Sequence, residues 1–202
     1  MTASTTPAQA LVAAVTQGDD ATVERLLDAG VPVESKDQNG DTALANACFN
    51  GLLRTSLLLL SAGANPNAAN RDGDTVLMWA ATTGRLDICE ALLRAGANVN
   101  AENKKGYRAL FRAAYKDHAE LVKMLLVAGA EPKHVNAHGK TVLDQAREWQ
   151  QYEIIEVLEM CATLDGFEFM KRQYPEVASN FVASTFVSGR ELAARMASPP
   201  RR

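Results

Sequence analysis

Cysteines are few and long apolar runs are missing in this sequence of 202 residues. Its three cysteines, Cys48, Cys89 and Cys161, match no zinc or disulfide spacing, so we expect buried free thiols in a reducing compartment. No stretch approaches the about 18 apolar residues of a membrane span, and residues 1–15 lack the basic start of a Sec signal. We therefore expect a cytoplasmic protein, with a leader for a specialised secretion system as the alternative.

Catalytic motifs are missing as well. The thirteen glycines form no GxG pair, and the sequence contains neither HExxH nor GxSxG. His134 and His138 have a metal-like spacing without a cysteine close by, so we place both on a loop surface, and we expect His118 to be an exposed polar residue. These observations predict no enzyme, no cofactor and no metal site.

Neither sign of charge dominates the chain, whose formal net charge is -3. Proteins that bind nucleic acid or a membrane surface usually carry a basic excess over a whole domain. We therefore expect neither as a ligand, and any basic surface must be local.

A period of 33 residues is what the sequence does contain. Four columns of identical residues recur at this spacing: one of Leu, one of Ala and two of Gly. The Gly of one column follows a Leu pair each time. The columns are Leu11, Leu44, Leu77, Leu110 and Leu143; Ala14, Ala47, Ala80, Ala113 and Ala146; Gly40, Gly73, Gly106 and Gly139; and Gly30, Gly63, Gly96 and Gly129. Four columns in one register predict a repeat protein.

Each repeat unit has the same local pattern. Two short runs with helical periodicity, for example 75–83 and 86–94, are followed by a turn or extended hairpin such as 96–106. Thr42, Thr75 and Thr141 suit N-caps, each worth roughly 1 kcal/mol, and the Gly after the second run suits a left-handed cap. The pattern predicts an all-α chain of helix, helix and hairpin units.

The segments "DQNGDTALANACFNGLLRTSLLLLSAGANPNAA" and "NRDGDTVLMWAATTGRLDICEALLRAGANVNAE" resemble ankyrin repeats. The shared pattern is a turn Gly, Thr-x-Leu, an Ala pair, a Gly, a Leu pair and Gly-Ala-x-x-Asn. The resemblance implies an ankyrin solenoid over 7–160, with about five repeats including degenerate caps. The repeats are 7–36, 37–69, 70–102, 103–135 and 136–160.

Both ends fall outside the period. We expect 1–6 to be flexible and 161–202 to be a partly helical extension with a disordered end. Phe167 and Phe169 in this extension could cover the apolar end of the stack, as terminal repeats of solenoids require. Alternatively, 181–196 forms a helix that binds a partner or docks on the chain itself. The sequence leaves both readings open.

Helical spacing separates two faces of the first helix in the repeat 103–135. Leu110, Ala113 and Ala114 share the core face, and we place Arg108, Arg112, Tyr115 and Lys116 on the opposite face. That repeat has seven basic and three acidic residues, whereas the repeat 70–102 sums to -2. It also has Arg108 where other repeats have a capping Thr, and Asp117 where others have Gly.

The resemblance implies that this face and the hairpin tips line a concave groove that binds partner proteins. The candidate binding residues are Asp41, Phe49, Asp74, Trp79, Lys104, Lys105, Tyr107, Arg108, Arg112, Tyr115, Lys116, Lys140 and Trp149. Aromatic rings with Arg are typical of interface centres. The alternatives are that Trp79 and Trp149 fill gaps between helices and that the charges form a solvated face.

We therefore expect a monomeric, non-catalytic protein-binding module whose partner presents an acidic patch. Within that class the alternatives are a stoichiometric regulator of an enzyme, such as an inhibitor or an immunity-type protein, and a secreted effector acting on host proteins.

Overall fold

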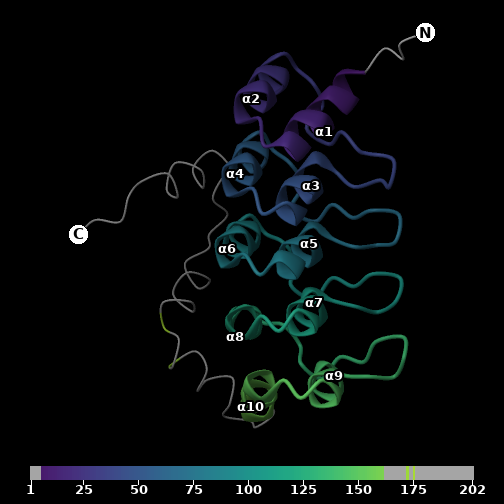
Figure 1. Ribbon diagram of the computed structural model, residues 1–202, viewed down its shortest axis with the longest axis vertical. Coiled ribbons are helices and arrows are strands. Elements are labelled where there is room, and N and C mark those ends of the chain that lie inside the picture. Colours follow the sequence, from purple (N-terminus) through teal and green to yellow (C-terminus); the bar gives the residue numbers. More distant parts are fainter. Residues whose placement is uncertain (1–5, 162–171, 173–174, 176–202) are drawn as a thin grey trace.

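A computed structural model describes residues 6–161, 172 and 175 of the chain. Residues 6–161 form ten helices in two layers (Figure 1). The inner layer contains α1 (Pro7–Gln17), α3 (Ala43–Phe49), α5 (Val76–Thr83), α7 (Ala109–Tyr115) and α9 (Val142–Glu148). The outer layer contains α2 (Asp20–Asp28), α4 (Leu53–Ser61), α6 (Leu86–Arg94), α8 (Ala119–Val127) and α10 (Tyr152–Cys161).

The helix pairs stack in sequence order, and each outer helix is joined to the next inner helix by a loop (Figure 1). All four loops extend to the same side of the inner layer. Single antiparallel bridges close two of them, between Lys36 and Thr42 and between Ala69 and Thr75. The predicted all-α solenoid with hairpin loops is confirmed.

Threonine starts four of the five inner helices, Thr6 at α1 and, as the sequence predicts, Thr42, Thr75 and Thr141 at α3, α5 and α9. The side chains of Thr42, Thr75 and Thr141 accept hydrogen bonds from backbone N–H groups three residues ahead, at 3.2, 3.3 and 3.2 Å. Arg108 occupies the same position in α7 and makes no side-chain cap. The repeat 103–135 therefore lacks a stabilising contact that its neighbours have.

Small side chains let the inner helices approach one another closely. Ala47, Ala80 and Ala113 are all 0% exposed, and α3 packs against α5 and α5 against α7. The leucine column lies beside them, buried except for Leu143, which is only partly buried at the end of the stack. The two columns form one continuous core, so no repeat has a core of its own.

The turn between the two helices of a repeat needs a left-handed residue, and Gly84 supplies one with φ of 70°. A Cβ at Gly84 would lie 2.6 Å from the imidazole of His118 in the next repeat, so a side chain there would displace that ring. The prediction that His118 is an exposed polar residue was therefore wrong: it is partly buried, with Nε2 3.4 Å from the Thr82 carbonyl. Asp117 keeps the left-handed turn, with φ of 60°, although it is not glycine.

Parts of the sequence predictions lie outside the described residues. These are the flexible segment up to residue 5 and nearly all of the extension 161–202, including Phe167, Phe169 and the helix at 181–196. The predicted boundaries of the repeat domain stay predictions.

Two of the three cysteines lie in the core, as predicted. Cys48 and Cys89 are free and buried, and burial raises the pKa of the Cys48 thiol to about 12. Cys161, at the end of α10, is only partly buried, which corrects the expectation of three buried thiols.

Thiol labelling tests this placement. With Ellman's reagent at about pH 8, we expect at most one thiol of the native chain to react quickly, because thiolate is the attacking species and burial suppresses it at Cys48 and Cys89. Cys161→Ser should abolish the fast phase, and guanidinium should expose all three thiols of the wild type. Rapid reaction of two or more native thiols would contradict the packing.

A charge in the alanine column tests the stack. Ala113→Arg should abolish cooperative unfolding, because burying a charge costs several kcal/mol against a total stability of about 5 to 15 kcal/mol. Ala62→Arg is the matched control, since Ala62 is exposed after α4. Thermal melts followed by circular dichroism would give the answer, and an unchanged melt of Ala113→Arg would refute the stack at this repeat.

Candidate functional site

A loop residue that the sequence analysis missed fixes each hairpin. Asn103 Oδ1 accepts hydrogen bonds from the backbone N–H of Lys105 and Tyr107, at 3.0 and 2.9 Å. The equivalent residues of the other loops make the same pair of bonds; they are Asp37, Asn70 and Asn136. These four positions are 33 residues apart, so the period itself contained the signal.

The loops also bind the inner helix of the following repeat. Trp79 Nε1 donates to Asp41 Oδ1 at 3.0 Å, and Arg112 Nη2 donates to Asp74 Oδ1 at 2.9 Å. Both pairs are 38 residues apart, so in each the loop of one repeat holds a groove side chain of the next. We call these pairs the loop ties.

Asp74 is the most enclosed member of the ties. It is 8% exposed, and its Oδ1 also accepts from Asn103 Nδ2 at 2.6 Å. Nothing in the sequence pattern indicated that this candidate binding residue is buried. A buried carboxylate needs compensating donors, and Asn103 and Arg112 supply them.

Arg112 lies on the face opposite the core, but its charge is already paired with a carboxylate of the chain. Its guanidinium pairs with Asp74 and lies 6.0 Å from the centre of the Trp79 ring. The Nε of Arg112 is buried and has no hydrogen-bond partner among the described residues. Arg112 therefore shapes the groove more than it offers a free cation.

The pKa of the Asp41 carboxyl responds to its burial and to groups of its own loop and of the next repeat. Burial raises the pKa of the Asp41 carboxyl, and the nearby carboxylate of Asp37 raises it further. The hydrogen bonds from Asn70 and Trp79 act in the opposite direction.

Two aromatic pairs lie along the groove. Phe49 meets Trp79 edge to face with ring centres 5.2 Å apart, and Tyr115 meets Trp149 at 4.7 Å. Phe49 is 50% exposed, Tyr115 52% and Trp149 44%, whereas Trp79 is partly buried. The two rings of each pair therefore contact each other, and each pair still presents ring surface to solvent.

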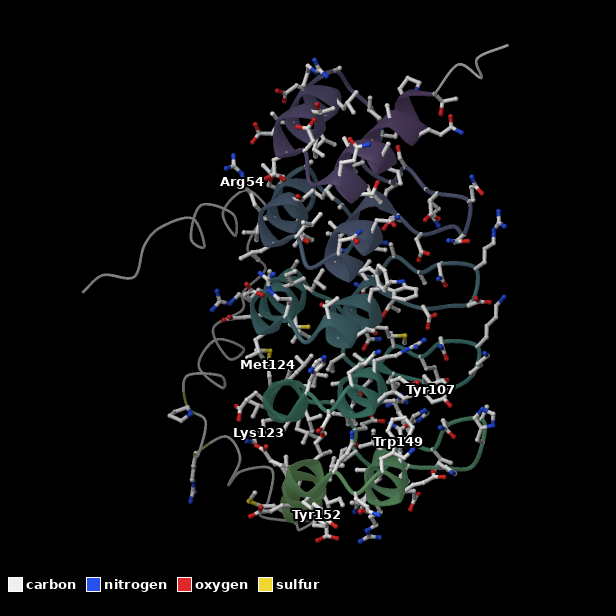
Figure 2. All side chains as sticks on the ribbon, viewed as in Figure 1. Arg54, Tyr107, Lys123, Met124, Trp149 and Tyr152 are labelled. Atoms are coloured by element: carbon white, nitrogen blue, oxygen red, sulfur yellow. The ribbon has the colours of Figure 1, made fainter. Side chains whose placement is uncertain are left out.

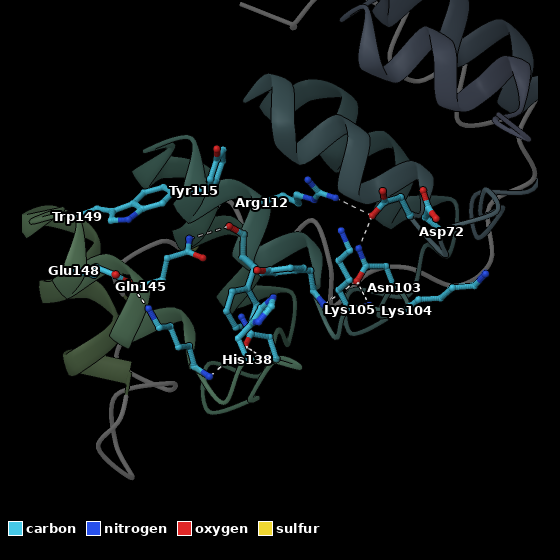
Figure 3. A pocket seen from close by; sticks show the side chains of 15 residues that line it. Asp72, Asn103, Lys104, Lys105, Arg112, Tyr115, His138, Gln145, Glu148 and Trp149 are labelled. Atoms are coloured by element: carbon cyan, nitrogen blue, oxygen red, sulfur yellow. Dashed lines mark hydrogen bonds and ion pairs between the residues drawn. The ribbon is translucent and has the colours of Figure 1, made fainter.

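The second pair lies at a pocket of about 510 Å³, which we call the end pocket (Figure 3). Its apolar wall contains Tyr107, Phe111, Tyr115 and Trp149, and Tyr107 meets Phe111 edge to face at 5.6 Å. Its polar lining comes from three successive loops and from α7 and α9. The polar residues are Asp72, Asp74, Asn103, Lys104, Lys105, Arg112, Asn136, His138, Lys140, Gln145 and Glu148.

Lys140 is paired across this pocket. Its Nζ donates to Glu148 Oε2 at 2.5 Å, and this bond raises the pKa of the Lys140 ammonium.

Of the two loop histidines, His138 is exposed as expected. His134 is instead partly buried, with Nε2 2.9 Å from the Gly106 carbonyl oxygen, so the prediction for His134 was wrong.

The structure gathers most of the candidate binding residues into two groups. Eight line the end pocket: Asp74, Lys104, Lys105, Tyr107, Arg112, Tyr115, Lys140 and Trp149. Asp41, Phe49 and Trp79 lie at the preceding repeats, joined by the first loop tie and the first aromatic pair. Figure 2 shows Tyr107 and Trp149 on the loop side of the stack and Arg54 and Lys123 on the outer side.

Arg108 and Lys116 do not line the end pocket. Arg108 Nη1 is 2.7 Å from Glu131 Oε2, and its Nε is 3.7 Å from Glu102 Oε2, so its charge is held between loops. The predicted shared face fails for Arg108 because this residue has extended backbone, with φ of -118°, where helical spacing does not apply. Lys116 follows α7 and places Nζ 5.5 Å from the Tyr115 ring.

The stacked helix pairs and their capped loops define a helical repeat protein. Family models described as "Ankyrin repeats (3 copies)" and "Ankyrin repeats (many copies)" match residues 11–103 and 92–146. The chain belongs to the ankyrin repeat family. No curated protein matches it significantly.

Ankyrin repeats are generally non-catalytic modules of protein–protein interaction. None of the helices between residues 6 and 161 is both long and apolar enough to cross a bilayer. In the described part of the chain, His, Cys, Asp and Glu side chains nowhere gather in threes where they could hold a metal ion.

Removing Arg112 tests the second loop tie. Arg112→Ala leaves the buried carboxylate of Asp74 with Asn103 alone, so we expect the free energy of unfolding to fall by about 1 to 3 kcal/mol. Lys116→Ala, on the same helix end, should cost less than about 0.5 kcal/mol. Urea denaturation measures both.

A double variant separates the charge effect from packing. Asp74→Asn with Arg112→Ala leaves no unpaired charge, so its loss should be smaller than the sum of the two single losses. Additive losses, or equal losses for the Arg112 and Lys116 variants, would show that the tie contributes nothing.

Proposed function

We propose that the protein is a non-catalytic binding module that holds a partner protein in its groove. The observation that carries the proposal is the pair of exposed aromatic contacts, Phe49 with Trp79 and Tyr115 with Trp149. Exposed rings that are already held in place lose little entropy when a partner covers them, and aromatic residues dominate the energetics of many interfaces.

The loop ties support the same proposal. They connect groove side chains to the neighbouring repeat, so the groove surface is organised before a partner arrives, and prior organisation lowers the entropic cost of binding. Hydrogen bonds from backbone N–H groups to a loop side chain, such as those to Asn103 Oδ1, fix the hairpin loops that form the other wall of the groove.

Two finer proposals follow within this class. The module acts as a stoichiometric regulator that masks an enzyme, or as an effector on host proteins. We also propose a cytoplasmic location, which suits the free, buried thiols of Cys48 and Cys89 because reducing compartments preserve them.

Comparative affinity capture tests the groove. The wild-type chain and a Tyr115→Ala, Trp149→Ala double variant are used as baits in lysate of the source cells, with Tyr152→Ala as the matched aromatic control. Tyr152 is 75% exposed and begins the outer helix α10, away from the end-pocket lining. We expect a protein that is enriched by the wild type and by Tyr152→Ala and at least about tenfold weaker with the double variant.

Equal capture by all three baits would contradict binding through the groove. Once the captured protein is known, loss of its activity on mixing with the purified chain would favour the regulator, and a host protein would favour the effector.

A further inference from the structure

The repeat 103–135, which we call the basic repeat, pairs several of its basic side chains with carboxylates of the chain itself. Arg108 and Arg112 are held by carboxylates of neighbouring segments, and Lys123 lies between Glu120 and Glu153. Among the described residues, no ion pair engages the remaining basic side chains of this repeat, which are Lys104, Lys105, Lys116 and Lys133. The net positive charge of the repeat is therefore available only at these four lysines.

Two of the four lysines are adjacent and line the end pocket. Lys104 and Lys105 are exposed on the loop that faces Tyr115 and Trp149 across the pocket (Figure 3). Lys116 and Lys133 lie outside its lining. Within this repeat, the positive charge that borders the end pocket without an ion pair is therefore on one loop.

The backbone that bears these two lysines is held firmly. Lys104 N–H donates to the Asp72 carbonyl at 3.0 Å, and the Lys105 carbonyl accepts from Ala137 N–H at 3.0 Å. Lys105 N–H donates to Asn103 Oδ1. The loop is therefore bonded to the loops on both sides of it, and only the lysine stems need ordering when an anion binds.

The opposite wall of the pocket favours an aromatic group. Tyr115 and Trp149 present about half of their surface, and Tyr107 and Phe111 form an edge-to-face pair beside them. Rings prefer such offset or edge contacts with further rings. A volume of about 510 Å³ lies within the usual range for ligand pockets, so the pocket can enclose a large side chain.

We propose that the end pocket takes a segment of the partner in which an aromatic side chain is flanked by carboxylates. The aromatic side chain packs on Tyr115 and Trp149, and the carboxylates pair with Lys104 and Lys105. This proposal rests on the proposed function and adds the chemistry of the partner segment.

The preceding repeats argue for a short acidic segment over a nucleic acid. Asp37, Asp41 and Asp72 lie on the loops before the basic one, and the repeats 37–69 and 70–102 are net acidic. A phosphate backbone that followed the groove would meet these carboxylates, whereas a peptide can place its negative charge at Lys104 and Lys105 alone.

Model peptides test the proposal on the full chain. The first carries one phenylalanine between pairs of glutamates; the second has alanine in place of phenylalanine, and the third has lysines in place of the glutamates. Each is fluorescein-labelled and titrated by fluorescence anisotropy at low and at moderate salt. We expect the first peptide to bind at least about tenfold more tightly than the other two, and its affinity to fall as salt rises.

Charge reversal locates the site. Lys104→Glu with Lys105→Glu should lower the affinity for the first peptide at least about tenfold, since repulsion replaces attraction. The first peptide should then bind no more tightly than the lysine peptide. Lys36→Glu with Lys133→Glu is the matched control, because both lysines are exposed, form no ion pair within the described part of the chain and lie outside the pocket. This control should keep the affinity within about twofold. Circular dichroism confirms that both variants stay folded.

Several outcomes would overturn the proposal. They are no binding of the first peptide, equal binding of the lysine peptide, an unchanged affinity in the Lys104 and Lys105 variant, and equally tight binding of a single-stranded oligonucleotide. If a captured protein still depends on Tyr115 and Trp149 while the peptides fail, the groove function stands and only the acidic, aromatic segment is wrong.

Discussion

The close approach of the inner helices is the constraint on which the rest of this structure depends. Ala47, Ala80 and Ala113 occupy equivalent positions with no exposed surface, so each inner helix fits against the next with no space for a larger side chain. This approach sets the distance between successive loops. Only at that distance can a carboxylate on one loop reach the groove side chain of the next repeat, as Asp41 and Asp74 do.

Some charged side chains of the groove are paired within the chain, and others remain available to a partner. Arg112 and Lys140 both line the end pocket, yet each is paired with a carboxylate of the chain. Lys104 and Lys105 are not ion-paired among the described residues. Net charge alone would overstate the attraction of this repeat for an anion, since paired cations act mainly as structural parts.

Much of the fold could be predicted from the sequence, and less of the site. Period and helical spacing placed Leu110 and Ala113 in the core, and cap chemistry placed Thr42 at a helix start, because these depend on local backbone geometry. The burial of Asp74 and the side-chain direction of Arg108 were not predicted, because both residues lie in extended or loop backbone, where side-chain directions depend on neighbouring repeats. The face of Arg112 was predictable, but its partner lies 38 residues away, across a repeat boundary that helical spacing does not describe.

The loop ties also bear on how such a chain can change its length. Asp41 and Asp74 are 33 residues apart, as are Trp79 and Arg112, so removing one whole unit would place Asp41 opposite Arg112. A carboxylate accepts a hydrogen bond from an indole N–H or from a guanidinium, so the new junction would be chemically sound. Duplication and loss of units during evolution can therefore proceed without redesign of the boundary between them, while the groove acquires a new order of aromatic and charged positions.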